Sequence, residues 1–174
     1  MHEEARAILP LLLDAWHADA PVLIGHSDGA SIALIRAAEN PVTALVCLAP
    51  HVFVEDTCLD SIRAAKASFD RGALRERMAR HHRDVDACFY WWNDVWLHPE
   101  FPRRNIEGLL SAIVVPALLI QGAEDRHRLA QIDSVAGRVR GPVERVVLEA
   151  RHAPHLEAPY DTLVRVARFL DTVG

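Results

Sequence analysis

The sequence predicts an α/β fold with about four parallel strands, flanked by helices and interrupted by a helical insertion. Three observations support this prediction. Short runs rich in valine, isoleucine and leucine alternate with helical spacing in the first and last thirds of the chain. Such continuous apolar runs are typical of parallel strands whose sheet is covered by helices on both faces. Between about residues 57 and 110 the spacing stays helical, and 174 residues suffice for one core of this size.

The first fifty residues are expected to alternate between helix and strand. Proline marks most of the boundaries. Pro10 predicts a kink within the first helix, Pro41 ends the second helix, and Pro50 stops the second strand. The expected elements are, in order, a helix over 3–18, a strand over 22–24, a helix over 30–39 and a strand over 42–49.

The rest of the chain has a helical middle and then alternates again. Gly141 and Pro142 turn the chain between a helix and the last strand. The expected elements are helices over 61–69, 72–83 and 84–97, a strand over 117–120, a helix over 129–139, a strand over 143–148, a loop over 151–159 and a helix over 160–172. We therefore divide the chain into a core, residues 1–56 with 111–174, and a helical part, residues 57–110.

A pentapeptide at the end of the first strand, Gly25-His26-Ser27-Asp28-Gly29, has the spacing of a nucleophile turn. A sharp turn from strand to helix strains the backbone at its apex and projects that side chain above the sheet. The flanking positions are expected to be small, because strand and helix approach too closely for a Cβ atom. The helix N-terminus adds a partial positive charge beside the apex. We therefore predict Ser27 as a nucleophile.

A serine nucleophile needs a base, and the loop after the last strand offers two histidines. An imidazole accepts and returns a proton near neutral pH. His152 lies where the strand ends, and a side chain there can reach over the sheet, whereas His155 opens the closing helix. Both histidines remain candidates on position alone.

The acid that would orient the base is Asp125, in the turn 121–125 after the third strand. Ser27, Asp125 and His152 follow one another in the order expected for a nucleophile turn on a parallel sheet. All three follow the C-terminal ends of parallel strands, where open α/β sheets place their sites.

Three segments carry a resemblance to the α/β-hydrolase family, of the esterase and carbon–carbon-bond hydrolase type. Residues 22–30 resemble its nucleophile elbow, residues 121–125 look like its GxxD acid turn, and residues 152–157 are similar to its GHxPHxE histidine loop. In that loop the first histidine is catalytic, which favours His152. The glycine that usually precedes it is Arg151 here.

The resemblance implies a serine hydrolase that acts on a small ester, thioester or activated carbonyl compound. It implies Ser27 as nucleophile, His152 as base, Asp125 as its orienting acid, and the N–H of Asp28 as an oxyanion donor. Some members of the family keep the acid after the strand that here spans 42–49, so the resemblance makes Asp56 the reserve candidate for the acid. The helical part, 57–110, matches the position of the family's cap, an insertion that covers the site and shapes substrate choice. No metal and no organic cofactor is implied.

Members of that family carry further strands and a His-Gly loop ahead of the elbow strand, and this loop donates one N–H to the oxyanion hole. Met1 lies one helix before the elbow, so we expect a partial fold that lacks its N-terminal half. The elbow strand would then be an exposed apolar edge, through which two copies could pair along Val22–Ile24. The alternative function is a weakly active or inactive remnant that acts as a binding or assembly module.

The helix over 84–97 carries five aromatic residues. A helix that is apolar on nearly every face is buried or lines a pocket. We expect most of these rings inside the helical part and one or two facing the substrate, and we mark Trp91, Trp92 and Trp96 as pocket candidates. Asn93 and Asp94 are further candidates, for polar groups of the same pocket.

Charge and cysteine usage argue against several other classes. The net charge of −5 and the scattered arginines leave no footprint for a nucleic acid. Three distant cysteines without a C-x-x-C pair argue against a disulfide framework and fit a reducing, cytoplasmic location. The apolar runs are too short for a membrane span. The cluster His81, His82, Asp84 and Asp86 fits no common metal spacing, and a small-molecule substrate is the expected partner.

Overall fold

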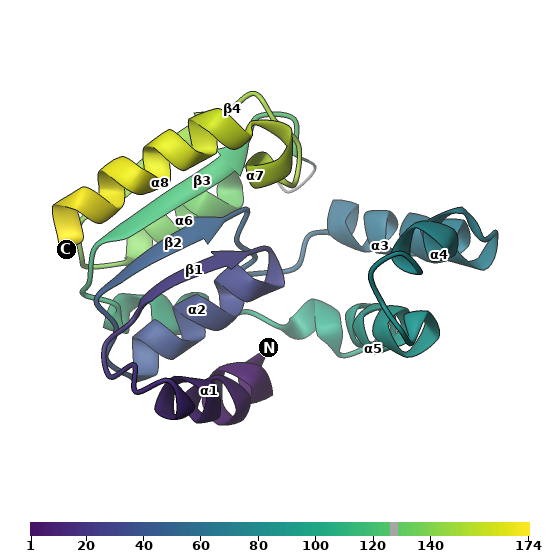
Figure 1. The fold of residues 1–174 in the computed structure, drawn as a ribbon, viewed down its shortest axis with the longest axis horizontal. Coiled ribbons are helices and arrows are strands. Elements are labelled where there is room, and N and C mark those ends of the chain that lie inside the picture. Colours follow the sequence, from purple (N-terminus) through teal and green to yellow (C-terminus); the bar gives the residue numbers. More distant parts are fainter. Residues whose placement is uncertain (126–128) are drawn as a thin grey trace. The chain divides into compact units, whose positions relative to one another are not determined.

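The computed structural model describes residues 1–125 and 129–174, which form two compact units (Figure 1). One unit consists of Met1–Val52 and Asn105–Gly174 and contains the sheet, so we call it the sheet unit. The other, Phe53–Arg104, is the helical unit. The helical part predicted from the sequence, 57–110, begins and ends a few residues later than this unit.

Four parallel strands form the sheet. They are β1 (Val22–His26), β2 (Ala44–Leu48), β3 (Ala117–Gly122) and β4 (Val143–Leu148), in the spatial order β1-β2-β3-β4. The register pairs Gly25 with Cys47 and Cys47 with Leu119. β2 and β3 are buried throughout, whereas β1 and β4 are partly exposed. The predicted α/β class with four parallel strands is confirmed, and β1 and β3 continue past their predicted ends.

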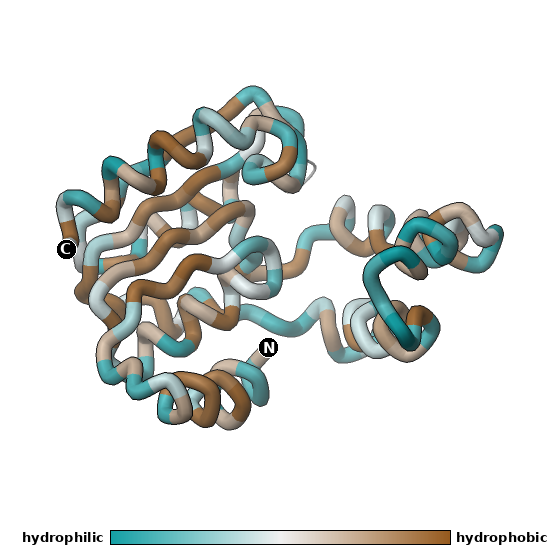
Figure 2. Tube along the Cα trace, in the orientation of Figure 1, coloured by the Kyte–Doolittle hydropathy of each residue, from teal (hydrophilic) through white to brown (hydrophobic). Residues whose placement is uncertain are grey.

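Helices cover both faces of the sheet. α2 (Asp28–Glu39) and α6 (Ala130–Arg138) connect successive strands, and α8 (Pro159–Val173) closes the chain. Right-handed crossovers that advance in one direction place their helices on one face of a sheet. α8 covers the other face, where Val46 of β2 and Phe169 of α8 belong to one core cluster. In Figure 1 α8 crosses in front of the sheet and α6 lies behind it, and Figure 2 shows the strands as the hydrophobic centre of this unit.

The N-terminal segment accommodates Pro10 by a change of helix type. Glu4–Ile8 forms a π-helical turn, η1, which is followed by α1 (Leu9–Ala15), and Pro10 lies in the first turn of α1. Proline has no N–H to donate to the preceding turn, and its ring crowds the carbonyl four residues earlier. The helix predicted over 3–18 therefore changes type ahead of Pro10 and ends before its predicted boundary.

The helical unit has a small aromatic core of its own. Its helices are α3 (Asp56–Asp70), α4 (Ala73–Met78), α5 (Val85–Trp96) and the short 3-10 helix η2 (Phe101–Arg103). The rings of Phe69 and Phe89 stack with their centroids 3.9 Å apart. Trp96 packs on Phe101 with a centroid distance of 4.5 Å. The helical character predicted for this part is observed, and α3 begins five residues before its predicted start.

Three short helices are additions to the predicted elements, and one of them is η2 of the helical unit. The segment 151–159, predicted as a loop, contains α7 (Pro154–Glu157), and the 3-10 helix η3 (Glu107–Ala112) precedes β3. The loop prediction was wrong here because Pro154 has the fixed φ that suits the first turn of a helix. Among the described residues, every helix is too short or too polar to cross a membrane.

Candidate active site

The turn between β1 and α2 holds Ser27 in a backbone conformation that few side chains adopt. Its φ is 56° and its ψ is −122°. The N–H of Ser27 donates to the carbonyl of Leu48 at the end of β2 (2.9 Å), which ties the turn to the neighbouring strand. A non-glycine residue at positive φ carries backbone strain, and such residues cluster at active sites. The serine therefore has the backbone geometry predicted for an elbow.

The two glycines of the turn differ in how much space surrounds them. A Cβ atom on Gly25 would collide with the backbone of Gly29 and Ala30, because the strand and the helix cross closely there. A Cβ atom on Gly29 would meet nothing within 4 Å. The expectation that both flanking positions must be small is therefore right for Gly25 and wrong for Gly29.

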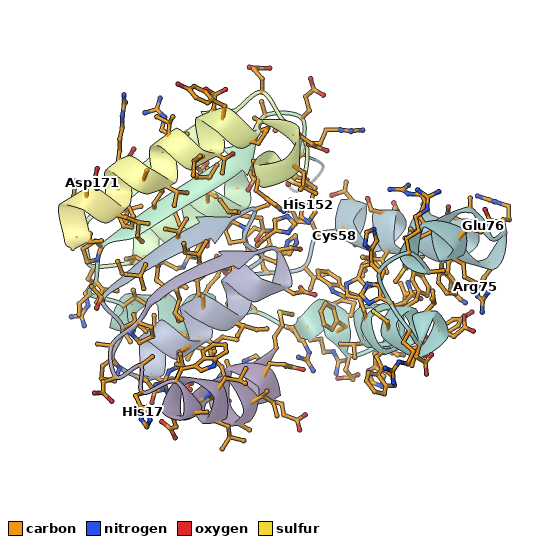
Figure 3. The ribbon with its side chains drawn as sticks, viewed as in Figure 1. His17, Cys58, Arg75, Glu76, His152 and Asp171 are labelled. Atoms are coloured by element: carbon orange, nitrogen blue, oxygen red, sulfur yellow. The ribbon has the colours of Figure 1, made fainter. Side chains whose placement is uncertain are left out.

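Side chains from three strand ends form a continuous series of hydrogen bonds. Ser27 Oγ lies 3.0 Å from Nε2 of His152, and Nδ1 of His152 lies 2.9 Å from Oδ2 of Asp125. The Asp125 side chain is 1% exposed, and that of His152 is 37% exposed. Figure 3 shows His152 at the carboxyl ends of the strands. The structure thus brings together the three residues selected from the sequence, with His152 and not His155 at the serine.

The position of Asp125 depends on β3 and on the histidine loop. Gln121 is fully buried and donates from Nε2 to Oδ2 of Asp125 at 2.6 Å. A Cβ atom on Gly122 would collide with the carbonyls of Ala150 and Arg151, so glycine lets the end of β3 approach that loop. No role was predicted for Gln121 from the sequence. The sequence feature that could have identified it is a polar residue at the end of an otherwise apolar strand, shortly before the acid.

A further histidine of the turn supports the loop that carries His152. His26 Nε2 donates to the backbone carbonyl of His152 at 2.7 Å, and its ring lies 4.6 Å from that of His155. Burial lowers the pKa of His26, so the ring is neutral near pH 7. A neutral imidazole has one N–H, and this bond uses it. His26 therefore tethers the histidine loop to the end of β1.

A second histidine also reaches the serine. Nε2 of His51 lies 3.1 Å from Ser27 Oγ, and the His51 ring stacks on that of His152 with centroids 5.5 Å apart. His51 is 6% exposed and lies just beyond the end of β2. No role was predicted for His51 from the sequence. The sequence feature that could have identified it is its position directly after a central parallel strand, where sites of this fold class lie.

The remaining candidates lie in the helical unit. Trp91 is 78% exposed, Trp92 37% and Trp96 3%. Asn93 is fully buried and donates to a backbone carbonyl of α3 (3.3 Å), which is a structural contact within the unit. Asp56 is the first residue of α3. The pocket role predicted for the three tryptophans stays a prediction.

Other side chains of chemically reactive types either make structural contacts or are buried. Asp84 accepts from the N–H of Ala87 (2.9 Å) and caps α5, and Asp86 accepts two hydrogen bonds from Arg75 (2.9 and 2.8 Å). In the part of the chain that the structure describes, no group of three His, Cys, Asp or Glu residues could hold a metal ion. Burial raises the pKa of Cys47 to about 12, so its thiol stays protonated.

Comparisons with solved structures show the fold. An enol-lactonase from Burkholderia xenovorans is 19% identical with a TM-score of 0.69, over 98% of this chain and 73% of that one. An esterase from Thermogutta terrifontis is 18% identical (TM-score 0.67, 99% and 72%), as is an E-2-(acetamidomethylene)succinate hydrolase (0.64, 94% and 71%). No protein-family profile and no curated protein matches the sequence. The chain has the α/β-hydrolase fold that its motifs predict.

Proposed function

We propose that this chain is a serine hydrolase that cleaves a small ester, thioester or activated carbonyl compound. The observation that carries the proposal is the hydrogen-bonded series Ser27, His152 and Asp125, with the serine at positive φ. A serine hydroxyl beside a histidine that a carboxylate orients is the arrangement that activates serine for attack on an acyl carbon. The α/β-hydrolase fold supports the same function.

The proposed reaction has two halves. Ser27 Oγ attacks the acyl carbon while Nε2 of His152 takes the hydroxyl proton, and the carbonyl oxygen gains a negative charge. The N–H of Asp28, the first residue of α2, donates to that oxygen, and the positive end of the helix adds to its stabilisation. His152 then gives the proton to the leaving group, and water repeats both steps on the acyl-enzyme. Asp125 keeps the Nδ1–H tautomer of His152 and stabilises the cation.

The substrate proposal extends to the acyl group. An enol-lactonase and an esterase among the similar structures favour an ester bond as the target. We keep the tryptophans of α5 as proposed contacts for an apolar or ring-bearing acyl group. Trp91 and Trp92 are favoured over Trp96 because their side chains are exposed. The proposed steps use no metal and no organic cofactor, and we propose that they take place in the cytoplasm on a small-molecule substrate.

A fluorophosphonate probe tests the proposal, because it reacts with activated serines. We expect the wild-type chain to take one label, Ser27→Ala to take none, and Ser61→Ala to be labelled like the wild type. Ser61 is a matched control, since it lies on α3 and bonds to a carbonyl of its own helix (2.9 Å). A folded wild-type chain that takes no label would contradict the proposal and favour the remnant function.

The edge position of β1 favours assembly as a second candidate function. In the described part of the chain β1 pairs with β2 alone, and Ile24 is 55% exposed. An exposed apolar edge strand is a template for another strand. We therefore propose that two copies pair along Val22–Ile24. Light scattering at micromolar concentration is expected to give the mass of a dimer, and a stable monomer would contradict the pairing.

A further inference from the structure

The loop after β2 is held from three sides and carries His51 to Ser27. The N–H of Ala49 donates to a carbonyl of β3 (2.8 Å), and Ser31 Oγ donates to the carbonyl of His51 (2.5 Å). The N–H of Val52 donates to a side chain of α6 (2.9 Å). Ala49 has a φ of 47°, and a strained alanine persists where the surroundings determine the backbone. The loop therefore presents His51 in a fixed position.

The hydrogen bonds that the Ser27 hydroxyl can make determine the role of His51. A hydroxyl has one proton to donate and two lone pairs that accept. The Nδ1–H of His152 donates to Asp125, so the neutral ring accepts at Nε2, and the proton of Ser27 is used there. What Ser27 Oγ offers to His51 is then a lone pair. The contact of 3.1 Å is a hydrogen bond when Nε2 of His51 carries a proton.

We propose that His51 is a second catalytic histidine, which donates a hydrogen bond to Ser27 Oγ and so orients the nucleophile. This inference rests on the proposed function. With the hydroxyl proton directed at His152 and one lone pair bound by His51, the other lone pair is left for the acyl carbon. Fixing a reacting atom in this way lowers the entropic part of the barrier.

His51 keeps its proton throughout the proposed cycle. When Oγ forms its bond to the acyl carbon, the hydroxyl proton of Ser27 passes to His152, and the carbonyl π electrons move onto oxygen. The carbonyl then re-forms, the bond from the acyl carbon to the leaving group breaks, and His152 passes that proton to the leaving group. In the second half the oxygen of a water molecule bonds to the acyl carbon while one water proton passes to His152, and the carbonyl π electrons again move onto oxygen. The carbonyl re-forms once more, the bond between the acyl carbon and Oγ breaks, and Oγ takes the proton back from His152. The His51 N–H stabilises the negative charge that develops on Oγ until His152 returns the proton.

Two substitutions of His51 distinguish the contribution of its N–H donor from that of its ring. His51→Phe keeps a ring without an N–H, whereas His51→Gln keeps an N–H without a ring. We expect fluorophosphonate labelling of Ser27 to be about 10- to 100-fold slower in His51→Phe, and about threefold slower at most in His51→Gln, as for loss or retention of a hydrogen bond to a charged group. His152→Ala is expected to abolish labelling, because His51 offers Ser27 a proton and no lone pair.

Three results would overturn the inference: wild-type labelling of His51→Phe, equal slowing in both His51 variants, or persistent labelling of His152→Ala. After either of the first two results, a wild-type chain labelled at Ser27 shows that the proposed function stands, whereas persistent labelling of His152→Ala would also remove His152 as the proposed base. Should a variant fail to fold by circular dichroism, long-range ¹H–¹⁵N spectra of the wild-type imidazoles decide. A proton on Nε2 of His51 is expected, and an unprotonated Nε2 at neutral pH would overturn the inference.

Discussion

The acid of the candidate site, in the sheet unit, and an ion pair on the surface of the helical unit are held in opposite ways. In the sheet unit Asp125 is 1% exposed and bonds to two neighbours, and the turn at Gly25 leaves no room for a Cβ atom. In the helical unit Arg75 and Asp86 pair with 53% of each side chain exposed, and such pairs contribute little to stability. The candidate chemistry therefore lies where the backbone is constrained, whereas substitutions of exposed charged residues in the helical unit are expected to cost little stability.

The strongest prediction concerns kcat/KM, and it distinguishes the acid in the sheet unit from the reserve acid in the helical unit. We expect Asp125→Asn to lower kcat/KM for a p-nitrophenyl ester by about 10⁴-fold, because the amide favours the wrong tautomer of the histidine. Asp56→Asn, the reserve acid on α3, is expected to leave the rate unchanged. Steady-state kinetics of both variants measure the difference. A larger loss of kcat/KM in Asp56→Asn than in Asp125→Asn would show that the acid is Asp56, in the helical unit.

Two tryptophans of α5 test how the helical unit divides its roles. Trp96→Ala is expected to lower the free energy of unfolding by about 3–5 kcal/mol, because it removes a buried ring. Trp91→Ala, at an exposed position, is expected to leave stability nearly unchanged and to raise KM for esters with aromatic acyl groups. Urea titration and steady-state kinetics measure the two effects. Equal destabilisation by both substitutions would contradict the observed burial.

The glycines of the elbow test the constraint on the sheet unit. Gly25→Ala is expected to destabilise the fold by about 1–3 kcal/mol or more, because its methyl group would collide with backbone. Gly29→Ala has open space and lies within α2, where alanine is favoured over glycine by up to about 1 kcal/mol. The midpoints of urea unfolding report both changes. Similar midpoints for the two variants would contradict the difference in the space around Gly25 and Gly29.

The smallest effect concerns pH and His26. Burial lowers the pKa of His26 in the folded chain below the ordinary value of 6.5. Below that pH the unfolded chain takes up a proton more readily than the folded one, so this contribution to stability is present above pH 6.5 and is lost on acidification. His26→Gln is expected to show a shallower decline of unfolding free energy with falling pH. Parallel declines in the two proteins would argue against the shift.

Much of the sheet unit could be predicted because its signals are local. The boundaries of β4 match the prediction, since its apolar run lies between Gly141-Pro142 and a polar loop. The ends of β1 and β3 were set too early, because His26 and Gln121 are polar and yet continue the pairing. The elbow was found through its spacing, which a strand-to-helix turn demands.

The rest of the site depends on positions in space that no local pattern records. His51 and Gln121 gain their contacts where strand ends meet, and this arrangement exists only after the sheet has formed. The difference between Gly25 and Gly29 likewise depends on how closely the helix crosses the strand. An all-round apolar helix does not reveal which face is covered, so the different exposures of Trp91 and Trp96 could not be predicted.

The proposed function requires that Ser27 becomes acylated during turnover, and mass spectrometry can detect the acyl group on its peptide. The wild-type chain is mixed with p-nitrophenyl acetate, quenched in acid during turnover, and digested. If Ser27 is the nucleophile, one acetyl group is expected on the peptide that contains Ser27, and none on that peptide in Ser27→Ala. An adduct confined to another residue, or a hydrolysing chain that never carries an acyl group, would contradict it.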